Sequence, residues 1–118
     1  MRVTGIGGLF FRCSDPDATA QWYHEHFGIN PVPTEAGQEP WRQDAGPTVF
    51  APFPNDADYF PSEKSWMINF RVDDLDEIVA RLRGDGISVE VSPEDPTGKF
   101  ARLYDPEGNP IELWQPAP

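Results

Sequence analysis

Glu112 is the residue of this sequence that is best placed to act as a general base. It belongs to residues 105–114, where Asp, Pro and Gly at the first, second and fourth positions predict a type I turn followed by a strand. Side chains of a strand alternate between two faces, so Glu112 and Trp114 share one face while Ile111 and Leu113 share the other. If the apolar pair packs against helices, the carboxylate lies beside an indole on the opposite face. There it either does chemistry or supports the fold.

The two histidines and the single cysteine point less clearly to a site. His24 and His26 are two residues apart in a predicted helix, so they face different sides and lack the i, i+4 spacing of a zinc helix. We interpret His24 as a surface residue and His26 as partly packed. Cys13 falls on the helix-facing side of its predicted strand and is expected in the core. The sequence contains no Gly-rich phosphate loop, Ser-His-Asp set or paired-cysteine motif.

Length and charge narrow the classes of protein to which this chain can belong. Its 118 residues predict one domain. A net charge of −11, from 20 acidic and 9 basic residues, argues against nucleic acid as a partner, because phosphates require a basic surface. No apolar stretch is long enough for a signal peptide or a membrane span, and a lone cysteine cannot form an internal disulfide. We therefore expect a cytoplasmic protein that binds neither nucleic acid nor membrane.

The periodicity of the chain predicts short strands and two helices. The first helix opens at Ser14-Asp15-Pro16 and stops at Gly28, and the second is capped by Asp73 or Asp74. The predicted strands cover residues 3–13, 29–34, 41–43, 48–51, 65–72, 87–91, 99–104 and 110–114. Residues 52–65 form a loop containing Tyr59 and Phe60, which is either a lid over a site or a linker between two halves.

The order of these elements repeats along the chain. Phe11-Arg12-Cys13-Ser14-Asp15-Pro16-Asp17 matches Phe70-Arg71-Val72-Asp73-Asp74-Leu75-Asp76, and each copy joins a strand to a helix cap. We expect an α+β fold of two tandem βαβββ modules within one domain, residues 1–53 and 65–115, joined by the loop 54–64. Their sheets would each carry a helix on one face and curve around a cleft with the other.

Three segments give the chain a resemblance to a known superfamily. They are Asp15-Pro16-Asp17 through Trp22-Tyr23 to Phe27-Gly28-Ile29, then Phe70 to Leu75, and the C-terminal Asp105-Pro106-Glu107-Gly108-Asn109-Pro110-Ile111-Glu112-Leu113. In this order and spacing they resemble the glyoxalase/bleomycin resistance/dioxygenase superfamily, also called vicinal oxygen chelate proteins. The resemblance implies the glyoxalase/bleomycin resistance-like fold and a homodimer, but no single reaction, because the superfamily includes enzymes and binding proteins.

The resemblance also implies where a metal ion would be held. The four ligand positions of metal-dependent members fall at Gly8, at Val49 or Phe50, at Met67 and at Glu112. Only Glu112 offers a donor suited to a hard or borderline divalent ion, and one carboxylate does not make a site. We therefore predict no metal and no other cofactor.

The expected cleft mixes apolar walls with a few polar groups, as ligand pockets do. Arg12 and Arg71 occupy matching positions in the two halves. One of them would clamp an anionic group of a ligand, or each would pair with a nearby acid such as Glu112. The residues expected to face the ligand are Phe10, Arg12, Met67, Asn69, Arg71, Glu112 and Trp114.

Three classes of function remain open: a binding protein, an enzyme and a module without a pocket. The acidic charge and the missing metal ligands favour a protein that binds a small organic molecule in its cleft without metal. The alternative is a metal-dependent lyase similar to lactoylglutathione lyase, an isomerase or a dioxygenase, with Glu112 as the catalytic residue.

Overall fold

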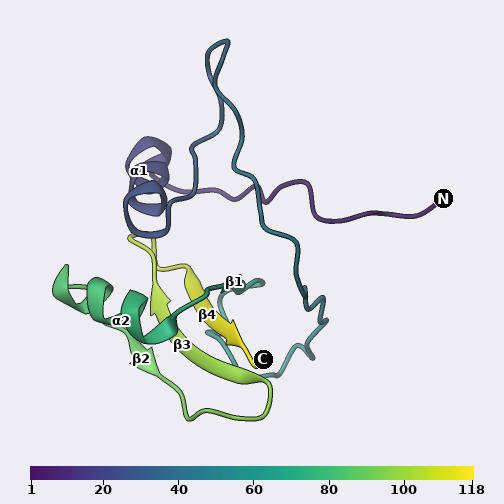
Figure 1. The fold of residues 1–118 in the computed structure, drawn as a ribbon, viewed down its shortest axis with the longest axis vertical. Helices are drawn as coiled ribbons and strands as arrows, with labels where there is room; N and C mark the ends of the chain where they lie inside the picture. Colours follow the sequence, from purple (N-terminus) through teal and green to yellow (C-terminus); the bar gives the residue numbers. More distant parts are fainter.

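One mixed β-sheet of four strands and two helices are the ordered elements of the computed structural model, which describes residues 1–118 (Figure 1). The strands lie in the order β1-β4-β3-β2, with β1 parallel to β4 and the other neighbours antiparallel. The elements are α1 (Pro16–Phe27), β1 (Ile68–Arg71), α2 (Leu75–Gly84), β2 (Glu90–Val91), β3 (Gly98–Tyr104) and β4 (Pro110–Pro116).

Both helices begin at the caps that the sequence predicts. The Asp15 side chain accepts a hydrogen bond from the Ala18 N–H at 3.1 Å, and Asp74 accepts one from Glu77 N–H at 3.0 Å. Gly28 ends α1 in the left-handed conformation, at φ 69°, where a residue without Cβ is favoured. Neither helix is long and apolar enough to cross a membrane.

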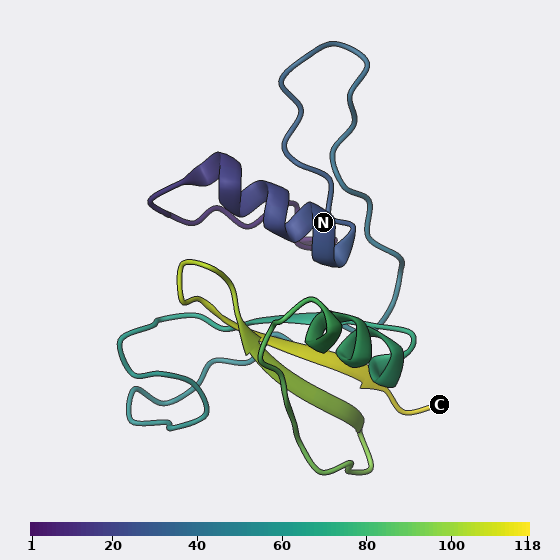
Figure 2. The same ribbon diagram turned by 90° about the vertical axis from the view of Figure 1, so that its left-hand side faces the viewer.

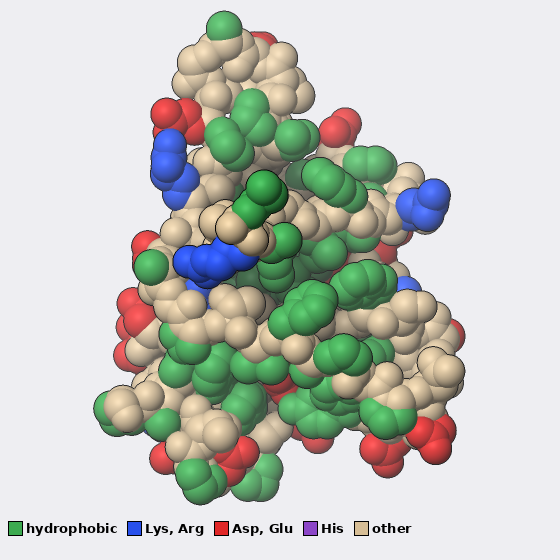
Figure 3. All heavy atoms as spheres, turned by 90° about the vertical axis from the view of Figure 1, so that its right-hand side faces the viewer, with side chains coloured by type: hydrophobic (Ala, Val, Ile, Leu, Met, Phe, Trp, Pro, Cys, Tyr) green, Lys and Arg blue, Asp and Glu red, His purple; other side chains and the backbone are tan.

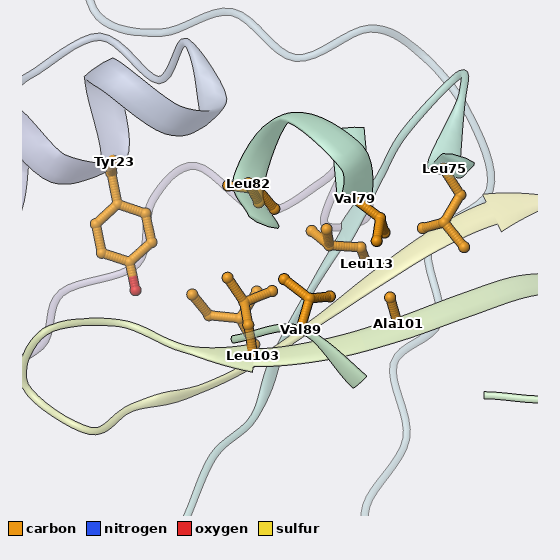
Figure 4. Close-up of a cluster of buried hydrophobic side chains, with 9 residues drawn as sticks. Tyr23, Leu75, Val79, Leu82, Val89, Ala101, Leu103 and Leu113 are labelled. Atoms are coloured by element: carbon orange, nitrogen blue, oxygen red, sulfur yellow. The ribbon is translucent and has the colours of Figure 1, made fainter. Parts of the chain in front are cut away.

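The core lies between α2 and one face of the sheet. α2 contributes Leu75, Val79 and Leu82, and it lies across that face as Figures 1 and 2 show. Figure 4 shows these side chains pointing toward the strands. The buried residues that complete the cluster are Tyr23, Val89, Ala101, Leu103, Ile111 and Leu113. The alternation predicted for the last strand is therefore confirmed, because Ile111 and Leu113 face the helix.

A buried hydrogen bond joins α1 to the turn between β3 and β4. Tyr23 donates its hydroxyl proton to Asp105 Oδ2 at 2.6 Å. Burial, and then the Asp105 carboxylate, raise the pKa of the Tyr23 hydroxyl far above its usual value. The carboxylate also accepts from Glu107 N–H and Asn109 N–H, both at 2.9 Å, and so closes the turn on itself.

The strands predicted in the first half of the chain are absent from the structure. Residues 3–13, 29–34, 41–43 and 48–51 are in neither helix nor strand. A strand is stable only when its backbone pairs with a neighbour, and these segments find no partner within the chain. Glycines at 5, 7 and 8 and prolines at 31 and 33 weaken them further. The structure thus contains one sheet, and the two-module architecture is not seen in it.

Candidate functional site

The face of the sheet opposite α2 carries polar and aromatic side chains in two rows. Strand register aligns Asn69, Glu112 and Arg102 in one row across β1, β4 and β3. It aligns Arg71, Trp114 and Phe100 in the next row. We call this surface the polar face. It is the candidate site, because its polar groups are gathered together and take no part in the hydrophobic core.

Glu112 is the centre of a hydrogen-bonded cluster on this face. Glu112 is only 5% exposed, so its negative charge requires hydrogen-bonding or charged partners. Oε1 accepts from Asn69 Nδ2 at 2.8 Å, and Oε2 accepts from the Tyr59 hydroxyl at 2.6 Å. The Nε atom of Arg102 lies 3.6 Å from Oε2 and supplies the opposite charge. Both oxygens of the carboxylate therefore have a partner within the protein.

Tyr59 attaches the loop 52–65 to the sheet. In addition to its bond with Glu112, its backbone carbonyl accepts a hydrogen bond from Arg102 Nη1. The Arg102 guanidinium also lies 3.8 Å from the centre of the Tyr59 ring, a cation–π contact. Lys64 Nζ donates to Asn109 Oδ1 at 3.3 Å near the end of the same loop. The loop is thus held over the edge of the polar face.

A pocket of about 480 Å³ lies between this loop and the sheet. Residues 55–62 form one side, and Met67, Arg102 and Tyr104 contribute to the other. Ligand pockets for small molecules span roughly 300–1,000 Å³, so this space is of the right size for an organic ligand. Because Tyr59 lines the pocket and bonds to Glu112, the loop is a wall of the pocket as well as a connection.

Replacing Tyr59 with Phe should loosen the loop without removing the ring. The lost hydrogen bond to Glu112 should lower the free energy of unfolding by about 1 kcal/mol. Burial, and then the bond to Glu112, raise the pKa of Tyr59, so its neutral form is favoured in the folded state. Its stabilisation is therefore complete below the unfolded pKa near 10 and declines as the pH rises further.

Urea denaturation at pH 7 and at alkaline pH would measure both effects. Tyr59→Phe should show a smaller fall in stability above about pH 10 than the wild type. The control is Tyr104→Phe, since Tyr104 is 55% exposed. Equal behaviour of the two variants would show that the Tyr59 hydroxyl does not hold the loop.

The structure brings together five of the residues expected in the cleft and places two elsewhere. Asn69, Arg71, Glu112 and Trp114 share the polar face, and Met67 lines the adjoining pocket. The exceptions lie in the unpaired N-terminal segment: Phe10 is fully exposed, and Arg12 lines a shallow hollow beside Glu107 and Asn109. Their roles in ligand binding stay predictions.

Three members of the site are missing from the sequence-based set. Phe100 and Arg102 alternate with the buried Ala101 and Leu103, so the pattern of the predicted strand 99–104 could have placed them opposite the core. Tyr59 could not have been placed in the same way, because no periodicity links a loop to a strand 53 residues later.

The residues of this chain do not fit the metal site of the superfamily. No group of three or more His, Cys, Asp or Glu side chains is close enough to hold an ion. Gly8, Val49 and Phe50 are exposed and carry no donor atom in their side chains, and Met67 offers only a thioether. Glu112, the one residue suited to bind such an ion, already accepts hydrogen bonds from Tyr59 and Asn69.

The two histidines are outside the candidate site. His24 is exposed on α1. His26 is 8% exposed, and its Nδ1 lies 3.5 Å from Asp85 Oδ2. Of the two histidines, only His26 belongs to the packing of α1. The expectation of Cys13 in the core is wrong: it is half-buried and outside the buried cluster, because the strand predicted for it does not form.

Comparison with known proteins agrees with this α+β arrangement, and it confirms the resemblance to the glyoxalase/bleomycin resistance/dioxygenase superfamily. The sequence profile of the glyoxalase-like domain matches residues 8–114, so the chain belongs to the glyoxalase-like domain family. No curated protein matches it in sequence.

Solved structures show which proteins share the fold. TnmS3, an antibiotic binding protein from Streptomyces sp. CB03234, is 26% identical over 99% of each chain, with a TM-score of 0.67. A glyoxalase/bleomycin resistance protein from the same strain is 27% identical over 86% of this chain and 92% of its own, with a TM-score of 0.57. Lactoylglutathione lyase from Agrobacterium tumefaciens, 24% identical over 97% and 95% of the two chains, has a TM-score of 0.63 and shares the fold.

Proposed function

We propose that this glyoxalase-like protein binds a small organic molecule on the polar face of its sheet and does so without a metal ion. The observation that carries the proposal is the state of Glu112. A general base or a metal ligand must present a lone pair to its target, whereas Glu112 is 5% exposed and the hydrogen bonds to both of its oxygens come from within the protein. Glu112 therefore supports the site more than it performs chemistry in it.

The comparisons support binding over catalysis. TnmS3, which matches this chain over nearly its whole length, is an antibiotic binding protein. The polar face and the adjoining pocket offer aromatic rings, an amide and two guanidinium groups, a combination suited to recognition. The expected ligand contacts come from Met67, Asn69, Arg71, Glu112 and Trp114, with Phe10 and Arg12 added if the first half approaches the face.

We further propose that the first half forms its own module in a homodimer. The apolar side chains of residues 1–53 are largely uncovered in the single chain, and Figure 3 shows apolar side chains gathered over one face of the molecule. The radius of gyration is 15.2 Å, whereas a domain of this length is expected near 13–14 Å. A second copy would supply strands for the unpaired segments and complete two βαβββ units. A cytoplasmic location is consistent with the single cysteine.

A thermal-shift screen tests the proposed function, because any ligand of the folded state raises the melting temperature. We expect organic compounds to raise it and Mg²⁺, Zn²⁺ and Ni²⁺ to leave it unchanged, with no stoichiometric metal after dialysis. Light scattering on the same samples should give twice the mass of 13.3 kDa. A one-to-one metal content that disappears in Glu112→Gln would contradict the proposal and favour the lyase-like alternative.

A further inference from the structure

Two aromatic rings on the polar face lie parallel to each other. The ring planes of Phe100 and Trp114 differ by 4°, and their centroids are 6.2 Å apart. The Trp114 indole N–H donates to the Thr97 carbonyl at 3.0 Å, which fixes the orientation of the larger ring. Both side chains are half-buried on the face opposite α2, so they do not belong to the core. A pair held in this way offers a preformed apolar surface of the shape that a planar ring system fits.

Arg71 stands next to this pair and has no carboxylate partner. It is aligned with Trp114 in the register of β1 and β4. Its Nη2 donates to the Asp44 carbonyl at 3.0 Å, and no acidic side chain forms an ion pair with it. A guanidinium has five N–H donors, so most of those of Arg71 are left for another acceptor.

The neighbouring loop holds this guanidinium in place. A Cβ atom added at Gly46 would lie 1.8 Å from Arg71 Nη1, so the loop passes directly against the guanidinium. Together with the bond to Asp44, this close passage restricts where the guanidinium can go. A half-buried cation that is already positioned loses little entropy on pairing with an anion.

Arg102, the other cation of the face, is not free to bind an anion, because it is already paired with Glu112. Arg102 lies between Glu112 and Glu90 in the row across β4, β3 and β2. The net charge of −11 disfavours the approach of an anion. Such long-range repulsion is screened beyond about 8 Å at physiological ionic strength. The charge nearest the ligand therefore determines whether an anion can bind. That charge is Arg71.

We infer that the ligand is a planar aromatic molecule carrying an anionic group, with its ring plane against Phe100 and Trp114 and its anion paired with Arg71. The inference rests on the proposed function and adds the chemical class of the ligand. A bidentate bond from the guanidinium to a carboxylate would set the position of the ring on the aromatic pair.

Three small probes test this class by calorimetric titration of the full chain. They are 2-naphthoate, which is planar and anionic, 2-naphthylmethylammonium, which is planar and cationic, and cyclohexanecarboxylate, which is anionic and not planar. We expect 2-naphthoate to bind more tightly than either of the others. Equal or tighter binding of the ammonium compound would overturn the inference.

Variants locate the binding to this surface. Arg71→Met keeps most of the side-chain length and should weaken 2-naphthoate binding by about ten- to hundredfold, the range for a charge-assisted hydrogen bond. Trp114→Leu should weaken it about two- to tenfold through the lost stacking. Arg42→Met and Trp66→Leu are matched controls on exposed residues outside the site and should change nothing. Arg71→Lys should retain part of the affinity, and unchanged melting temperatures show that the variants fold.

The outcomes separate this inference from the proposed function. If an organic compound binds but Arg71→Met leaves its affinity unchanged, the inference fails while the function as a binding protein stands. If no probe and no compound of the thermal-shift screen binds, both fail. If dilution changes the tryptophan fluorescence of the wild type but not of Trp114→Leu, a second copy covers the ring pair, the surface is an interface and the inference is overturned.

Discussion

Glu112→Ala is expected to lower the free energy of unfolding by about 3 kcal/mol. Glu112 is 5% exposed, and its carboxylate neutralises Arg102, which would keep its charge beside an empty space. The Tyr59 hydroxyl and the Asn69 amide would lose their acceptor at the same time. Residues kept for catalysis alone often cost stability, so their removal is neutral or stabilising. A large loss therefore identifies Glu112 as a support of the fold.

Urea unfolding monitored by tryptophan fluorescence gives the measurement. Glu112→Gln should lose less than Glu112→Ala, because an amide oxygen can still accept from Asn69 or Tyr59. Glu90→Ala is the matched control: it removes a glutamate that is aligned with the same arginine but exposed, and should change stability by less than about 0.5 kcal/mol. Unchanged stability of Glu112→Ala would return the residue to the list of catalytic candidates.

Asp105→Ala should destabilise the fold by about 4 kcal/mol, more than any other single change proposed for this chain. Its carboxylate is buried and accepts from the Tyr23 hydroxyl at 2.6 Å and from the Asn109 amide at 2.8 Å, besides two backbone N–H groups. Removing it leaves those donors unsatisfied and removes the buried hydrogen bond between α1 and the turn. Calorimetric melting would detect the change as a large drop in melting temperature.

Two further variants show where that effect originates. Tyr23→Phe removes only the contact between α1 and the turn, and should cost about 1 kcal/mol. Asp95→Ala removes an exposed aspartate that organises the turn between β2 and β3 through Thr97, and a much smaller change is expected. If Asp105→Ala and Asp95→Ala behaved alike, turn geometry and not the buried link to α1 would account for the loss.

The second half of the fold could be predicted because its interactions are close in sequence or periodic. The cap at Asp74, the apolar stripe of α2 and the alternation in β4 each follow from a pattern of a few residues. The same patterns predicted strands in residues 3–13 and 48–51, which the structure does not contain. A pattern identifies a segment able to pair, but it does not show that a partner is present.

The candidate site was predictable to the extent that strands define it. Alternation placed Asn69, Arg71, Glu112 and Trp114 on one face, where the structure has them. It could not reveal that the Tyr59 hydroxyl donates a hydrogen bond to Glu112 Oε2, or that the Asp44 carbonyl accepts one from Arg71. Both contacts join loops to strands, and their geometry depends on the folded path of the chain, not on local preference.

The position of β4 determines when this domain can fold during synthesis. β4 lies between β1 and β3 although it follows them in the chain, and its residues Ile111 and Leu113 pair with Ile68 and Phe70 made more than forty positions earlier. β1 has no other strand to pair with until β4 leaves the ribosome. Since pairing between distant segments is slow, α2 and β1 are exposed to proteases and chaperones for the interval between their synthesis and that of β4.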